Sequence, residues 1–297
     1  SHVAPLFDFK EAFVGLDVLA SILRGEIIIE DIGLIEADIS IEKLSDSEWR
    51  IQGISFTSEG SDEVPEQLLY MIKNSDYLLH NSNIYYRDHT GDKLFLNLLD
   101  VNIDVNNSYD NHDIKFSMNL PEAYGEHLAV VAKLQGDIDD LAGDIYVEVK
   151  QINIDQWKKK FMVLDEFAIS AVLDAQLWAT LNEGQVDSLT AHFSAEKTFL
   201  QNNKTGRSWS TDYLSSDLRF LRDGEYWNVA VSDFYFGERL KPQWPQAATV
   251  IASEDDEAYF LSADVLRYTD LRNITGVFLE SEQLRQLDTL DEYQLQA

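Results

Sequence analysis

The chain of 297 residues contains no cysteine, which excludes disulfide bonds and thiolate metal sites. No apolar run reaches the roughly 18 residues that a membrane-spanning helix needs. Basic residues are few: 23 Lys and Arg stand against 53 Asp and Glu, for a formal net charge of −30. Such an acidic chain argues against nucleic-acid binding, because neutralising phosphates takes a basic surface. It also disfavours direct electrostatic attraction to an anionic membrane surface.

Motifs of known chemistry are also missing. The chain has no glycine-rich phosphate loop and no GxSxG elbow, and its six histidines show no HExxH spacing. The acids between Asp100 and Asp113 lack the ligand spacing of a calcium loop. Hydrolysis of glycans would need two carboxylates that converge in a cleft, which a sequence cannot show. The sequence therefore predicts a protein that is not an enzyme, with no catalytic residues, no metal site and no cofactor.

What the chain does have is alternation of apolar and polar residues. Its hydrophobic fraction is 45%, enough to build a core, and much of it follows a period of two. This period is typical of a strand with one apolar and one wet face. We expect three such strands to place their apolar residues on one face. The candidates are Ile35, Ala37, Ile39 and Ile41, then Val101, Ile103 and Val105, then Ile145, Val147 and Val149.

Turn and cap signals set the expected boundaries. Helical spacing predicts helices over 10–24, 65–73 and 281–291. The dipeptide Asp223-Gly224 predicts a hairpin, because it supplies positive φ angles. A shift in alternation near Lys150-Gln151 indicates a β-bulge. The expected domains are 1–165 and 166–297, or one continuous domain made of both.

These patterns predict an all-β-dominated, largely antiparallel fold with a few short helices. An antiparallel sheet must cover its apolar face. Two sheets can pack together as a sandwich, or one curved sheet can keep an apolar groove that holds a ligand. Periodicity alone leaves both solutions open.

Several segments resemble the AsmA-like envelope proteins, and their YhdP branch in particular. Residues 16–54 carry a short helix, an alternating hairpin, a polar turn and the strand Trp49-Arg50-Ile51. Residues 78–138 resemble the core of that family, and residues 143–157 resemble its repeated closing strand. The resemblance covers most of the chain.

The resemblance implies a place and a function. Proteins of this kind are held in the inner membrane of Gram-negative bacteria by an N-terminal helix, and their long periplasmic part forms an elongated, curved, groove-like sheet. It implies that this chain is an N-terminal periplasmic portion of a longer protein, without its anchor, and that its groove binds or conducts phospholipid between the inner and outer membranes. The implied partners are phospholipid or another acyl-chain ligand and other envelope proteins. A non-enzymatic scaffold or interaction module is the alternative, and a glycan hydrolase is a further one.

Overall fold

The computed structural model describes residues 8–16, 18–25, 29–57, 75–90, 95–137, 140–161, 167–224, 226–238, 241–242, 248–254, 259–263 and 276–277. Strands dominate these residues, their ladders are mostly antiparallel, and the helices are short. The expected fold class is thereby confirmed. The helices expected over 65–73 and 281–291 lie outside the described residues.

The chain divides into two compact units. Unit 1 comprises Ser1–Val149 with Trp178–Val186, and unit 2 comprises Lys150–Leu177 with Asp187–Ala297. The boundary expected after residue 165 falls inside unit 2.

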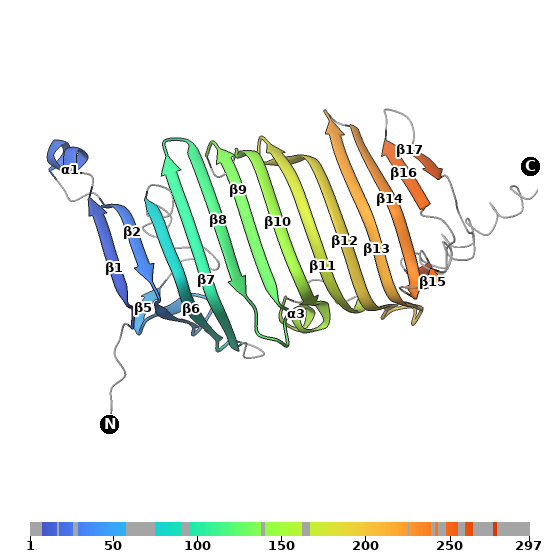
Figure 1. The fold of residues 1–297 in the computed structure, drawn as a ribbon, viewed down its shortest axis with the longest axis horizontal. Coiled ribbons are helices and arrows are strands. Elements are labelled where there is room, and N and C mark those ends of the chain that lie inside the picture. The colour runs from blue at the N-terminus through green and yellow to red at the C-terminus, as the bar shows by residue number, and fades with distance from the viewer. Residues whose placement is uncertain are drawn as a thin grey trace, which may run out of the picture. The chain divides into compact units, whose positions relative to one another are not determined.

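Unit 1 is built around an antiparallel meander of four strands, coloured cyan to green in Figure 1. These are β6 (Asp76–Asp88), β7 (Phe95–Ser108), β8 (Asn111–Asn119) and β9 (His127–Gln135). A two-residue turn joins β7 to β8, residues 120–126 join β8 to β9, and in each pair apolar residues stand opposite apolar residues. This pairing gives the sheet one apolar and one polar face.

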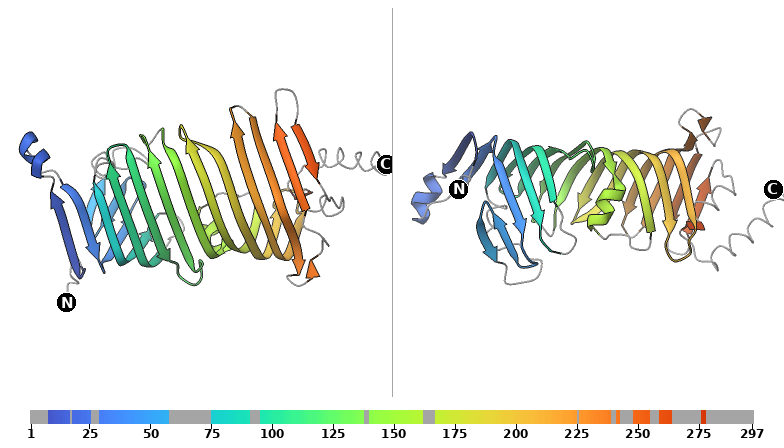
Figure 2. Two further views of the ribbon diagram at one scale, coloured as in Figure 1. Left: turned by 45° about the horizontal axis from the view of Figure 1, so that its top comes forward. Right: turned by 90° about the horizontal axis from the view of Figure 1, so that it is seen from below.

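The N-terminal strands extend the meander through parallel ladders. β2 (Ile29–Ile35) pairs with the first half of β6, and β3 (Asp38–Lys43) pairs with its second half. β4 (Glu48–Ile51) pairs with β3 across a bend at Ser45–Ser47, and β5 (Ile54–Thr57) pairs with β4. The right view in Figure 2 shows this blue hairpin projecting away from the row of β6 to β9.

The helix expected over 10–24 is wrong in its first half. Residues Glu11–Leu16 form strand β1, antiparallel to β2, and only Val18–Arg24 form helix α1. The Phe13 ring lies against Gly33, at a place where any Cβ would collide with it. The missing side chain of Gly33 thus gives this strand pair a close contact. The long-range ladder overrides the local helical spacing of Ala12 and Leu16.

Unit 2 repeats the antiparallel plan. Its central ladder is β12 (Gln185–Asn202), β13 (Ser208–Asp223) and β14 (Tyr226–Glu238), and the Asp223-Gly224 hairpin is confirmed between the last two. Gln151 takes a positive φ of 53° at the expected bulge. The other elements that enter this unit are β10 (Ala142–Asn153), α3 (Ile154–Phe161), β11 (Phe167–Asn182), β15 (Lys241–Pro242), β16 (Ala248–Glu254) and β17 (Tyr259–Ala263).

Candidate functional site

The apolar face of unit 1 is continuous across β6 and β7. Leu79 lies opposite Ile103, and Tyr77 lies opposite Val105. Further along the ladder Ile84 faces Leu98, and Tyr86 faces Leu96. Because directly opposed residues in a ladder share a face, these side chains form one surface. The face runs on through β8 and β9, where its members are Ile114, Phe116, Met118, Leu128, Val130 and Ala132.

The opposite face of the same strands is mainly polar, although Phe95, Leu99 and Val131 are exposed on it. Lys115 lies 3.6 Å from Asp104, and the Asn106 amide donates to Asp104 at 3.0 Å. The Asn119 amide donates to the Asp100 carboxylate at 2.8 Å. The strands of unit 1 therefore separate a mainly polar face from an apolar one.

Bulges keep the apolar residues in line. The β6–β7 register shifts on both sides of Ser82, where Asn81 and Asp100 have φ angles of 48° and 49°. Each bulge adds a residue, so Leu79 and Ser82 lie on one face although three positions separate them. Asn and Asp tolerate this backbone conformation better than most residues. The Asn102 side chain supports both bulges, since it accepts from the Asn81 N–H at 3.0 Å and donates to the Asp100 carbonyl at 2.8 Å.

Burial is uneven on this face. Val101 is fully buried, and Leu79, Leu96, Met118 and Ala132 are below a tenth exposed. Most of the residues around them are only half-buried. Burial also raises the pKa of the Tyr77 and Tyr86 phenols, as expected where the charged form is poorly solvated. The face is thus apolar in character but leaves part of its area accessible.

Of the first set of candidate groove residues, the structure places Ile35 on a different face from the others. Ile39 pairs with Ile84 and Ile41 with Tyr86, so both lie on the apolar face. Ala37 is buried beside Ser82. Leu34 pairs with Leu79 on the apolar face, and the next pair along the ladder is Ile35 with His80. Ile35 therefore lies on the opposite, polar face. The extra residue is Glu36, whose φ is 51°. The expectation that Ile35 shares a face with Ala37, Ile39 and Ile41 is therefore wrong, and Leu34 takes its place.

The other two sets lie as alternation predicts. Val101, Ile103 and Val105 share the apolar face, opposite Ser82, Leu79 and Tyr77. In β10, the Tyr146 hydroxyl donates to Glu148 at 2.7 Å, and the Tyr146 ring lies 5.2 Å from that of Trp178. Tyr146 and Glu148 occupy one side of β10, so Ile145, Val147 and Val149 share the other side. Whether any of these residues lines a lipid groove stays a prediction.

Sequence reasoning missed several members of the face. Ser82 is fully buried at its centre, yet a serine beside two asparagines carries no apolar signal. Residues Ile114, Phe116 and Met118 do alternate, and this period could have placed them on the face. Pairing with β7 is what brings them beside Ile103 and Val105.

Unit 2 has an apolar cluster of its own. Phe236 is almost fully buried against Trp209, Leu214 and Phe234, and the Trp209 and Phe236 rings meet edge-on at 5.8 Å. A depression of about 630 Å³ lies beside this cluster between β12, β13 and the end of β14. Polar and charged side chains such as Thr211, Asp212 and Glu238 line most of it. This depression therefore differs in chemistry from the apolar face of unit 1.

The part of the chain that the structure describes contains no cluster of three or more metal-ligating side chains. Within the same residues, no helix has both the length and the apolar composition to cross a membrane.

The fold and the site place the chain in one class of protein, the β-sheet proteins with one apolar and one polar face. The sequence model of the YhdP protein family matches residues 2–295, so the chain belongs to that family. This is a family of envelope proteins and is not a known enzyme family. No curated protein and no solved structure matches the chain.

Proposed function

We propose that this chain is a periplasmic segment of an inner-membrane-anchored envelope protein, and that its apolar sheet face binds or conducts phospholipid between the inner and outer membranes. The observation that carries the proposal is the continuous apolar face across β3 and β6 to β9, much of which is only half-buried. Membership of an envelope-protein family supports the location.

Physical chemistry favours acyl chains as the ligand. Each methylene that leaves water for an apolar surface contributes about 0.8 kcal/mol, so a chain laid along several strands gains substantial free energy. Residues such as Ile103 and Ile84 offer aliphatic contacts without buried hydrogen-bond donors that an acyl chain could not satisfy. The polar face keeps the other side of the sheet hydrated, as shown by Lys115 beside Asp104.

A pair of substitutions on one strand tests the proposal. Ile103→Asp puts a charge on the apolar face, whereas Asn97→Asp, at an exposed position opposite Tyr85, puts the same charge on the polar face of β7. A photoactivatable phospholipid should crosslink to the wild type and to Asn97→Asp, and much less to Ile103→Asp. Circular dichroism confirms that each variant is folded. Equal crosslinking of the two folded variants would contradict binding on this face.

The edge of unit 1 favours a second candidate, a non-enzymatic scaffold that binds a protein partner. All but one residue of β1 are exposed, and Phe13, Val14 and Leu16 present apolar side chains to solvent. Exposed strands of this kind accept an added strand from another protein. Recovery of one stoichiometric protein partner, together with an absence of lipid crosslinks, would favour this candidate over lipid binding.

A further inference from the structure

The apolar face of unit 1 continues from β6 to the edge of the sheet at β1. In the ladder of β2 with β6, apolar residues stand opposite the apolar-face residues of β6, and β1 repeats this in its ladder with β2. Because opposed residues share a face, these side chains form one surface, which we call the edge patch. Its members are Ala12, Val14, Ile32, Leu34, Tyr77 and Leu79.

Most of the edge patch is open to solvent. Val14 is 61% exposed on β1, and Ile32, Leu34 and Tyr77 are half-buried. Only Leu79 among the large members is below a tenth exposed. The apolar face therefore ends at β1 in accessible side chains rather than in a packed border.

Helix α1 lies next to this patch, in the connection between β1 and β2. β1 ends at Leu16 and β2 begins at Ile29, and Figure 1 shows α1 at the end of β1, beyond the sheet. Four aliphatic residues of α1 have the spacing that places them on one face of a helix. They are Val18, Leu19, Ile22 and Leu23, and all are 64–77% exposed. A helix usually buries such a face against another element, so this face lacks its cover.

The attachment of α1 lets the helix turn while the sheet stays fixed. The helix ends at Gly25, whose φ is 72° and whose surroundings hold no atom within 4 Å of a Cβ position. Glycine there combines a permissive backbone with open space. In contrast, the Ser75 hydroxyl donates to the Ile29 carbonyl at 3.2 Å and holds the start of β2 against β6.

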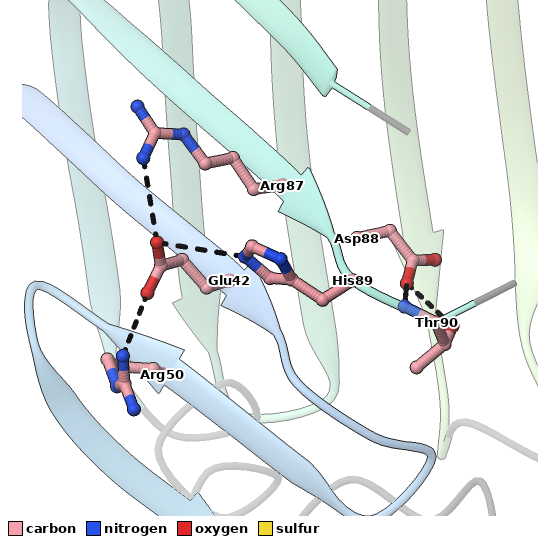
Figure 3. A network of polar contacts seen from close by, with 6 residues as sticks. All are labelled: Glu42, Arg50, Arg87, Asp88, His89 and Thr90. Carbon is pink, nitrogen blue, oxygen red and sulfur yellow. Dashed lines mark hydrogen bonds and ion pairs between the residues drawn. The ribbon is translucent and has the colours of Figure 1, made fainter. Parts of the chain in front are cut away.

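The opposite end of the same strands has a neighbour that is held in place. Glu42 of β3 pairs with Arg50 of β4 at 3.3 Å and with Arg87 of β6 at 3.7 Å (Figure 3). On the apolar side, the ring of Trp49 lies 6.4 Å from that of Tyr86. Ion pairs and ring contacts thus fix β4 to β6, whereas α1 keeps its apolar face in solvent.

The dimensions of α1 and the edge patch agree. Seven residues of helix span about 10 Å. The patch crosses three strands, about 10 Å in all, and its two rows lie about 7 Å apart along the strands. The four aliphatic side chains offer roughly 400 Å², about half of what each partner of a stable protein interface buries. This area is too small to hold a second protein but sufficient to cover the patch beside it.

We infer that α1 is a lid, which closes its apolar face over the edge patch when an acyl chain lies on that patch. This inference rests on the proposed function. In the open arrangement, α1 and the patch both expose apolar surface to water, and an acyl chain between them gives each a partner. The closed state therefore binds lipid more tightly than the open one, so lipid shifts the population toward closure.

Introduced cysteines can report the position of α1, because the chain has no cysteine of its own. Ile22→Cys with Tyr77→Cys places one thiol on α1 and one on the edge patch. A flexible bis-maleimide should crosslink this pair about 10-fold more when diheptanoyl phosphatidylcholine is added below its micelle concentration, since a minor closed state becomes the major one. Ile22→Cys with Leu78→Cys is the matched control, because Leu78 is the next residue, equally half-buried and on the opposite face. Its crosslinking should not change.

A second variant leaves the sheet untouched. Leu19→Ser with Ile22→Ser alters only side chains that are exposed in the open arrangement, so the variant should fold normally. Calorimetry should show that it binds the same lipid about 10-fold more weakly than the wild type, the loss of about one aliphatic contact. Val131→Ser, at an exposed apolar position on the polar face of β9, is the control and should bind as the wild type does.

The outcomes separate the lid from the proposed function. Lipid binding by the wild type without a change in crosslinking, or with unchanged affinity in the α1 variant, would overturn the lid and leave lipid binding standing. Equal crosslinking with and without lipid would overturn it in favour of a helix packed permanently on the sheet. Crosslinks between two molecules would overturn it in favour of a second copy as the partner of α1. A wild type that binds no lipid would contradict the proposed function itself, and the lid with it.

Discussion

The Ser82 hydroxyl joins two strands at the bulge of unit 1: it accepts from the Ala37 N–H at 3.0 Å and donates to the His80 carbonyl at 2.9 Å. Both Ala37 and Ser82 are almost completely buried. The hydroxyl therefore satisfies the Ala37 N–H beside the bulges at Glu36 and Asn81, and it adds a second donor to the His80 carbonyl, which also accepts from the Glu36 N–H at 2.8 Å. Unit 2 has a comparable buried serine, Ser216, which donates to the Ser232 carbonyl at 3.1 Å next to the bulge at Asp233.

Ser82→Ala should destabilise the protein. The substitution leaves the buried Ala37 N–H without its partner, which costs about 1–3 kcal/mol. The free energy of unfolding, measured by urea denaturation, should fall by this amount. Ser108→Ala, at an exposed position in β7, should change it by less than about 0.5 kcal/mol. Equal values for the two variants would show that the Ser82 hydroxyl does not support the bulge.

The turn between β11 and β12 should accept a stabilising substitution. Its two residues, Glu183 and Gly184, have φ angles of 50° and 67°. A two-residue turn with both angles positive favours Asn at the first position, whereas most other residues are strained there. Glu183→Asn should raise the free energy of unfolding by up to about 1 kcal/mol, and Glu183→Val should lower it by about 1–2 kcal/mol. Thermal denaturation of both variants checks this order of stability. A Glu183→Asn variant that is less stable than Glu183→Val would refute it.

Asp88 should make stability depend on acid pH. Burial alone would raise its pKa, but hydrogen bonds from the Thr90 hydroxyl and N–H, with Lys43 and His89 nearby, hold the pKa below its ordinary value. A depressed pKa stabilises the folded state above the ordinary carboxyl pKa of about 4, and this contribution is lost as the pH falls through the folded value.

The comparison that isolates this effect is wild type against Asp88→Asn. Their difference in unfolding free energy should be constant above about pH 5 and should shrink as the pH falls below about 4. Denaturation at a series of pH values measures the difference. If it stays constant down to acid pH, the Thr90 contacts do not depress the pKa of Asp88.

Helix α1 should tolerate polar substitution. Its side chains Val18, Leu19, Ile22 and Leu23 are 64–77% exposed, so replacing them removes little buried area. Leu19→Ser with Ile22→Ser should leave the free energy of unfolding within about 0.5 kcal/mol of the wild-type value. The same double variant should bind less of a dye that detects exposed apolar surface. A large loss of stability would show that these side chains pack against something in the folded protein.

Much of the fold follows from local sequence. The alternation of Val101, Ile103 and Val105 with polar neighbours predicts both the strand and its two faces, because side chains in a strand point to opposite sides in turn. The Asp223-Gly224 hairpin follows in the same way, because that dipeptide provides the positive φ that the turn requires. The acidic net charge and the absence of cysteine needed no structure to exclude whole classes of site.

Tertiary pairing decided the rest. Ile35 lies on the opposite face from Ile39 because Glu36 inserts one residue in a left-handed conformation, and no glycine marks that place in the sequence. Residues Glu11–Leu16 form a strand because β2 supplies a partner, whatever their local spacing favours. Glu42, Arg50 and Arg87 come from three strands and form ion pairs only in the folded sheet (Figure 3). Period-two alternation is a local property of the chain, whereas bulges and strand partners depend on hydrogen bonds between residues far apart in sequence, and only the folded sheet determines them.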